Sequence, residues 1–155
     1  FLKEAAARKI DLARPLVSIL DRPFRSRMRR LMASEIPDDP RLALITPRMV
    51  LSHCTGVPNW ARNQPLALQF RPGEKFGYSG EAYVYLQNVL EHVAGQPLQD
   101  LARRHVFDPL GMRDSSFVWR TDFDSRAAIG TEEGTPRPKW HPSEGLAAGT
   151  LHTTA

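Results

Sequence analysis

The hydrophobic pattern is most regular between Glu81 and Ala94. Apolar side chains recur there at steps of three and four residues, which is typical of one face of a helix. The pattern predicts a helix over 81–94, and Gly95 favours the left-handed backbone that ends a helix. The predicted apolar face comprises Ala82, Tyr85, Leu86, Val89, Leu90 and Val93, and the predicted polar face Gln87, Asn88, Glu91 and His92.

Proline marks the start of two shorter helices. Thr46 followed by Pro47 combines a hydroxyl N-cap with proline at the first helical position, and predicts a helix over 47–53. Pro97 predicts a helix over 97–106 in the same way. The pattern elsewhere is weaker and predicts a helix over 1–9, a strand over 115–119 and a loop over 121–142.

The composition is that of one globular domain. The chain has 155 residues, of which 41% are hydrophobic and 25% charged. No stretch approaches the roughly 18 uninterrupted apolar residues of a membrane span, so we expect none in this segment. The net charge of +4 is uneven, because five arginines lie between Arg22 and Arg30. Such a run can bind anionic partners, but it is usually a solvated face, and no nucleic-acid motif accompanies it.

A tyrosine lies at the start of the predicted 81–94 helix. Residues 70–80, here called the tyrosine loop, read Phe-Arg-Pro-Gly-Glu-Lys-Phe-Gly-Tyr-Ser-Gly, so that a Pro-Gly turn delivers Tyr78 to the helix. Three other segments accompany the loop. They are Ser-His-Cys-Thr-Gly-Val-Pro within residues 45–60, Phe-Asp-Pro-Leu-Gly-Met at 107–112 and Glu-Gly-Leu-Ala-Ala-Gly-Thr within 144–155.

In their order and spacing these segments resemble the serine beta-lactamase and penicillin-binding-protein superfamily, in its class C, esterase-like branch. The resemblance implies an α+β fold of the beta-lactamase/transpeptidase type, of which the segment present is mainly helical, with long loops and few short strands. It also implies that residues 1–155 are an incomplete single domain, namely the helical subdomain and the central part of a hydrolase domain.

Two motifs of that family are missing from the chain. Its members carry a nucleophilic serine and a lysine as Ser-x-x-Lys on one helical turn, yet no serine here has a lysine three residues later. A Lys-Thr-Gly or His-x-Gly strand motif is also absent. The resemblance places both motifs outside this segment, so we expect the nucleophile and the third motif to lie elsewhere in a longer parent.

The tyrosine loop is the motif that remains. By resemblance Tyr78 is the candidate catalytic residue, since the family's tyrosine takes part in acyl transfer. Ser79 and Gly80 are the candidate substrate-binding residues. The family usually has asparagine at the position of Gly80, and its loss implies a wider, less polar pocket that suits small esters or amides better than beta-lactams.

His53 and Cys54 are alternative candidates for chemistry. His53 could serve as a general base, but the resemblance favours a role in supporting the loop. Cys54 is the only cysteine, which excludes an intrachain disulfide. We expect an inert thiol there, because buried cysteines without a basic partner are the common case.

The sequence therefore predicts part of a serine hydrolase that forms an acyl-enzyme with a beta-lactam, peptide or small ester. A catalytically inactive binding or scaffolding module is the alternative, and an anion-binding basic module a third. We expect a small-molecule or peptide acyl substrate and neither cofactor, metal nor nucleic acid. The family resemblance suggests a bacterial periplasmic or secreted protein, or a cytoplasmic esterase, and leaves the oligomeric state open.

The 155-residue chain alone should be inactive, because it contains no serine–lysine pair. We expect no turnover of a chromogenic beta-lactam or a short-chain aryl ester in a spectrophotometric assay, with a known esterase as the positive control. Turnover by the purified chain that persists after further purification would contradict this prediction.

Overall fold

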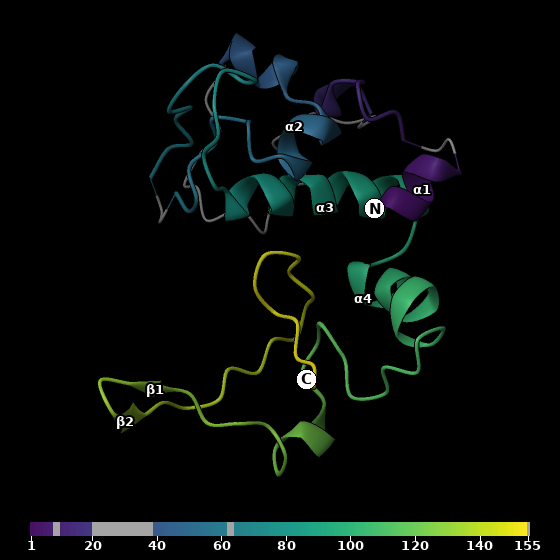
Figure 1. Ribbon diagram of the computed structural model, residues 1–155, viewed down its shortest axis with the longest axis vertical. Coiled ribbons are helices and arrows are strands. Elements are labelled where there is room, and N and C mark those ends of the chain that lie inside the picture. The colour runs from purple at the N-terminus through teal and green to yellow at the C-terminus, as the bar shows by residue number, and fades with distance from the viewer. Residues whose placement is uncertain (8–9, 20–38, 62–63, 155) are drawn as a thin grey trace. The chain divides into compact units, whose positions relative to one another are not determined.

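The computed structural model describes residues 1–7, 10–19, 39–61 and 64–154. The chain divides into two compact units (Figure 1). The first comprises Phe1–Gln96 with Ala147–Gly149, and the second Pro97–Leu146 with Thr150–Ala155. The arginine-rich run at 22–30 lies outside the described residues.

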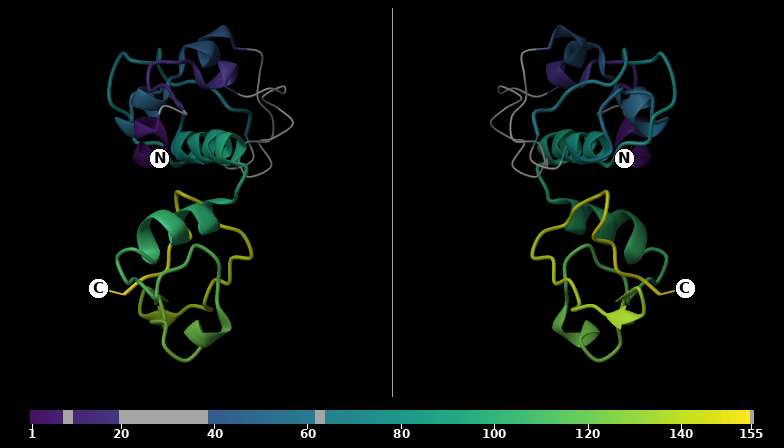
Figure 2. Two further views of the ribbon diagram at one scale, coloured as in Figure 1. Left: turned by 90° about the vertical axis from the view of Figure 1, so that its right-hand side faces the viewer. Right: turned by 90° about the vertical axis from the view of Figure 1, so that its left-hand side faces the viewer.

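The first unit is built around one long helix. Its elements are α1 (Leu2–Ala6), the 3₁₀ turns η1 (Leu16–Ser18) and η3 (Pro40–Leu44), α2 (Pro47–Leu51) and α3 (Gly80–Ala94). In the views of Figures 1 and 2, α2 and η3 lie on the same side of α3. The buried core joins α3 to the chain between 16 and 68, through Leu16, Leu42, Ile45, Val50, Val57, Ala61, Leu66, Leu68, Ala82, Tyr85, Leu86 and Val89.

Helix α3 confirms the predicted 81–94 helix and begins one residue earlier. Ser79 caps its N-terminus, since the Ser79 hydroxyl accepts a hydrogen bond from the Ala82 amide at 2.9 Å. Gly95 ends the helix with φ of 66°. This φ lies in the left-handed region where glycine avoids the steric cost of a side chain.

The predicted polar face of α3 is wrong in part, because Gln87 and Asn88 are buried. The Gln87 side-chain oxygen accepts a hydrogen bond from the Ala147 amide at 2.8 Å. The Asn88 amide donates to the Val84 carbonyl at 3.0 Å. Both polar side chains are thus buried with hydrogen-bond partners, which lowers the free energy that their burial costs.

Two short helices of the first unit end earlier than the pattern predicts. Helix α2 has the predicted N-cap, with the Thr46 hydroxyl 3.3 Å from the Met49 amide. It ends at Leu51 because the chain turns sharply at His53, whose φ is 54°. Helix α1 ends at Ala6, and residues 8–9 of the predicted 1–9 helix lie outside the described residues.

The second unit begins with α4 (Leu98–Ala102) and the π-helical turn η4 (Arg103–Phe107). The predicted 97–106 helix is therefore helical over most of its length but not one regular α-helix. Pro97 has ψ of 156° and is its N-cap, not its first helical residue.

The predicted 115–119 strand is wrong, since in the described chain this segment forms no strand and has a single isolated β-bridge, between Ser116 and His152. The Gln99 side-chain oxygen accepts a hydrogen bond from the Phe117 amide at 2.7 Å. Because that amide is bonded to a side chain, it does not extend a strand ladder.

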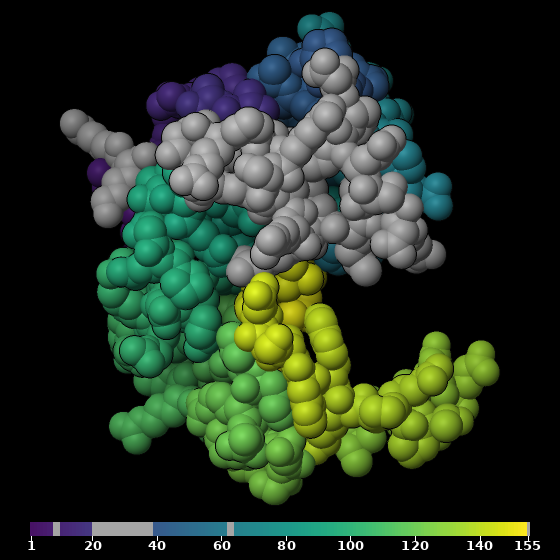
Figure 3. All heavy atoms as spheres, turned by 180° about the vertical axis from the view of Figure 1, so that it is seen from behind, coloured from purple at the N-terminus to yellow at the C-terminus, as the bar shows by residue number. Residues whose placement is uncertain are grey.

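A small hairpin lies within the predicted 121–142 loop. Strands β1 (Thr131–Glu132) and β2 (Thr135–Pro136) pair antiparallel. Positive φ at both Glu133 and Gly134 is typical of a tight hairpin turn. Both strands are exposed, and Figure 3 shows the hairpin standing out from its unit. The 3₁₀ turn η5 (Thr121–Phe123) precedes it. Among the described residues, no helix is both long and apolar enough to cross a membrane.

In the full-length protein, Val89→Ala should lower the free energy of unfolding by about 2 kcal/mol, because a side chain with no exposed surface is replaced by a cavity. Urea denaturation followed by circular dichroism measures this change. Val106→Ala is the matched control at a 41% exposed position, where we expect a change within about 0.5 kcal/mol. Equal effects of the two variants would contradict the assigned core.

Candidate active site

The tyrosine loop is held against the segment that follows α2. The Gly77 amide donates to the His53 carbonyl and the Gly73 amide to the Cys54 carbonyl, each at 2.7 Å. Gly56 has φ of 77°, and a Cβ there would meet the Phe70 carbonyl oxygen at 2.2 Å. Two of the segments singled out in the sequence are therefore paired through their backbones, and position 56 needs glycine because a side chain there would collide with the Phe70 carbonyl.

Ser79 ties this arrangement to helix α3. The side chain is buried, and its hydroxyl donates to the Pro58 carbonyl at 2.9 Å while it accepts from the Ala82 amide. The Ser79 amide donates to Nδ1 of His53 at 3.2 Å. His53 thus holds the loop through its unprotonated ring nitrogen, in agreement with the supporting role that the resemblance implies.

Tyr78 is exposed beside this anchored backbone. Its side chain is 60% exposed, and its ring lies on the His53 ring, with centroids 4.4 Å apart and planes at 31°. The Tyr83 ring also lies near the His53 ring, at 5.0 Å, and Phe76 meets it edge-on at 5.8 Å. The phenol of Tyr78 is therefore positioned by ring packing and is accessible to a small molecule.

Tyr85 offers a contrast within the same helix. It is 2% exposed, and desolvation raises the pKa of the Tyr85 phenol well above its usual range. A phenol that is buried and kept neutral does not exchange protons with a substrate. Tyr78, and not Tyr85, therefore has the accessibility that proton transfer requires.

The structure corrects the expectation of a wider pocket at Gly80. An ideal Cβ on Gly80 would lie 2.5 Å from Cζ2 of Trp60, 2.8 Å from its Cη2 and 2.9 Å from its Cε2. The space that an asparagine side chain would enter at this position is thus filled by an indole ring. The surroundings of Gly80 are less polar, as the sequence indicates, but they are not enlarged.

Hydrogen bonds that the sequence pattern does not reveal fix the backbone on both sides of Trp60 to the start of α3. Asn59 accepts from the Gly80 amide through Oδ1 and from the Glu81 amide through its carbonyl, each at 3.0 Å. The buried Glu81 carboxylate accepts from the Ala61 amide at 3.0 Å and lies in the first turn of α3, where the helix dipole favours negative charge. These roles depend on contacts across about 20 residues, which periodicity does not reveal.

Cys54 shows the features of a structural thiol. It is half-buried, and its sulfur donates to the Ser52 carbonyl at 3.4 Å. The nitrogen Nδ1 of its sequence neighbour His53 is bonded to Ser79. Within the described ranges, no group of three or more histidine, cysteine, aspartate or glutamate side chains is placed to hold a metal ion.

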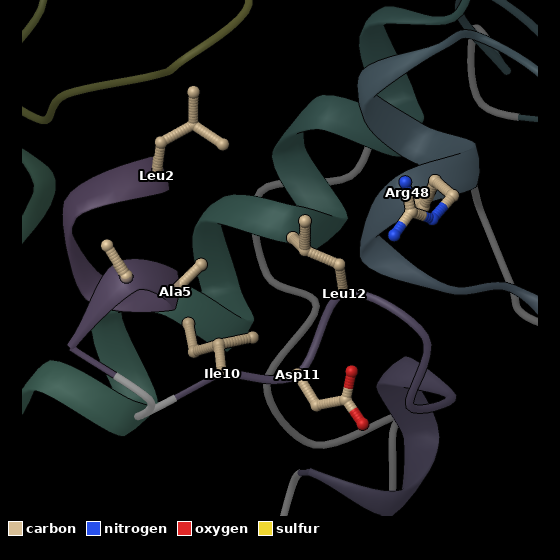
Figure 4. Close-up of a pocket in the computed structure, with 7 residues that line it drawn as sticks. Leu2, Ala5, Ile10, Asp11, Leu12 and Arg48 are labelled. Carbon is tan, nitrogen blue, oxygen red and sulfur yellow. The ribbon is translucent and has the colours of Figure 1, made fainter.

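A depression of about 650 Å³ lies elsewhere in the first unit (Figure 4). It includes no residue of the tyrosine loop. Its lining is mostly aliphatic and offers no nucleophile for acyl transfer, with one acid and one base among Leu2, Ala5, Ala6, Ile10, Asp11, Leu12 and Arg48.

Sequence comparison places the chain in a family. The model of the Beta-lactamase family matches residues 1–155. The chain therefore belongs to the Beta-lactamase family, which confirms the resemblance seen in its motifs. A curated relative, the lovastatin esterase of Penicillium rubens, is 28% identical over 116 residues, or 59% of this chain and 29% of the esterase.

Solved structures share the fold. A penicillin-binding protein from Bacillus halodurans matches with a TM-score of 0.70 and 22% identity, over 99% of this chain and 50% of its own. The D-amino acid amidase of Ochrobactrum anthropi SV3, complexed with D-phenylalanine, matches with a TM-score of 0.69 and 24% identity, over 97% and 51%. A class C beta-lactamase from Rhodobacter sphaeroides matches with a TM-score of 0.65 and 18% identity, over 97% and 43%.

These likenesses confirm the predicted fold class, a beta-lactamase-like α+β fold. This chain, whose regular elements are helices apart from two short strands in its described part, corresponds to a portion of that fold. It spans about half the length of the solved proteins it matches and 29% of the lovastatin esterase.

His53→Phe should lower the free energy of unfolding of the full-length protein by about 1–3 kcal/mol, because the Ser79 amide loses its acceptor while ring packing is largely kept. Chemical denaturation measures the effect. Tyr83→Phe is the control: it keeps a ring beside His53 and removes only a 3.4 Å hydrogen bond to the Leu51 carbonyl, so we expect a loss below about 1 kcal/mol. A His53→Phe protein as stable as wild type would refute the supporting role.

Proposed function

We propose that this chain is the central part of a serine hydrolase that works through an acyl-enzyme, with Tyr78 as a proton-transfer residue. The observation that carries the proposal is an exposed phenol fixed at the start of α3 in a chain that matches the Beta-lactamase family along its length. The bonds from the tyrosine loop to His53 and Pro58 support it, because catalysis requires a positioned group.

The reaction divides acyl transfer into two steps. A serine oxygen bonds to the acyl carbon, the serine proton passes by way of the tyrosine to the departing alcohol or amine, and water then releases the acid and restores the serine. Phenols, with pKa values near 10, are mostly protonated at neutral pH, so a nearby cation must assist the tyrosine.

The nucleophile of this reaction must come from outside residues 1–155. No serine of the chain precedes a lysine by three residues. Ser79, the serine next to Tyr78, is buried and its hydroxyl is bonded to Pro58 and Ala82, so it is unsuited to attack a substrate. In this proposal residues 1–155 are the helical subdomain and central part of one larger α+β domain.

The substrate is a small ester, amide, peptide or beta-lactam. Esterase and amidase relatives support the acyl class. Ser79 and Gly80 are the proposed substrate-binding residues. Ser79 fixes the backbone next to Tyr78, and Gly80 leaves space for the Trp60 ring. An inactive binding module is the second candidate, favoured by the absence of both an Ser-x-x-Lys motif and an amide side chain at position 80.

In the full-length protein, Tyr78→Phe should reduce the rate of acylation by about 10²–10⁴-fold and leave the fold intact, because only a hydroxyl and its proton transfer are lost. Stopped-flow kinetics with one aryl ester and one beta-lactam measures the rate, and mass spectrometry identifies the covalent adduct. Tyr83→Phe, the matched control, should acylate at close to the wild-type rate.

Two outcomes would contradict the proposal in different ways. A Tyr78→Phe protein that acylates within about threefold of wild type would remove Tyr78 from the mechanism. A wild-type protein that forms no adduct with either substrate would favour the inactive binding module.

A further inference from the structure

The conformation of Gly80 does not explain why this position is glycine. Gly80 is the first residue of α3, a conformation open to most residues, and its φ lies outside the positive range. What excludes a side chain is the Trp60 ring, three of whose atoms lie 2.5–2.9 Å from the position of a Cβ. Position 80 is glycine because an indole occupies the adjoining space.

The backbone on both sides of Trp60 is anchored to the start of α3. On one side, Asn59 accepts hydrogen bonds from the Gly80 and Glu81 amides. On the other, the Ala61 amide donates to the Glu81 carboxylate, which has no exposed surface. The backbone that carries the ring is therefore fixed to the start of α3 on both sides of Trp60.

Trp60 lies between the buried helix start and solvent. Gly80, beneath the ring, is buried, while Trp60 is half-buried and keeps exposed surface. Tyr78, two residues before Gly80, is exposed on the same short stretch of chain. The start of α3, two residues after Tyr78, thus packs against an aromatic ring and carries no hydrogen-bonding side chain at position 80.

We infer that Trp60 is a specificity-determining residue, whose indole packs on the acyl group of the substrate and selects aromatic or bulky alkyl acyl groups over small ones. This inference rests on the proposed function. Aromatic contacts of this kind change relative rates by roughly 3- to 10-fold, and an apolar wall discriminates poorly among groups that differ only in polarity. The selection is thus for apolar size, not for a hydrogen-bonding pattern.

The test compares how fast the full-length protein hydrolyses two esters that differ only in the acyl group. The kcat/KM for p-nitrophenyl phenylacetate is divided by that for p-nitrophenyl acetate, so that the leaving group is the same. Trp60→Ala should lower this ratio by roughly 3- to 10-fold, and Trp60→Phe should lower it less, because part of the ring contact is kept. Trp140→Ala, at a 59% exposed tryptophan of the second unit, is the matched control and should leave the ratio unchanged.

A paired substitution tests whether the Trp60 ring and a side chain at position 80 compete for the same space. Gly80→Asn alone should destabilise the protein, because the new side chain must displace the Trp60 ring. In Trp60→Ala/Gly80→Asn the space is free, so the melting temperature should recover part of that loss. The double variant should also acylate with a chromogenic cephalosporin faster, relative to the phenylacetyl ester, than wild type does.

The outcomes separate the two proposals. If wild type forms no covalent adduct with any ester, the proposed function fails and this inference fails with it. If wild type forms the adduct but Trp60→Ala keeps the phenylacetyl/acetyl ratio within twofold, only the role of Trp60 is refuted. Should Trp60→Ala not fold, Trp60→Phe decides by the same ratio, and a value equal to wild type overturns the inference.

Discussion

The hydrogen bond from the Ser79 amide to the His53 ring is the interaction on which the candidate site depends. It joins the sharp turn after α2 to the residue that caps α3, and it holds the ring on which Tyr78 packs. The His53 imidazole thus has two contacts here. Its Nδ1 binds the Ser79 amide next to Tyr78, and the face of its ring packs against the Tyr78 ring. The left-handed conformation at His53 makes this possible, because it ends α2 and turns the chain.

The sequence predicted the parts of this arrangement that have local causes. The Thr46 cap, the course of α3 and its end at Gly95 follow from periodicity and capping within a few residues. The motif pattern also predicted the family, the fold class and the supporting position of His53. Tyr78 lies just before the start of α3, as the sequence predicted, and its catalytic role stays a prediction.

The missed features depend on contacts between distant segments. The burial of Gln87 requires the Ala147 amide, and the loss of the 115–119 strand follows from the bond between Gln99 and Phe117. The identity of Gly80 is the clearest case. From sequence the absence of a side chain indicated empty space, whereas a tryptophan 20 residues earlier fills that space. A glycine in the sequence shows that a side chain is absent at that position, and only the fold shows which residue fills the space.

The bond between Gln87 and Ala147 also bears on the order in which the protein is made. It spans 60 residues of sequence, and the intervening residues 97–146 belong to the second unit. During synthesis, α3 leaves the ribosome well before the amide that its buried glutamine binds. The first unit therefore completes its hydrogen bonding only after most of the second has been translated. A chain cut at residue 96 would lose this hydrogen bond to α3, the helix that follows the tyrosine loop.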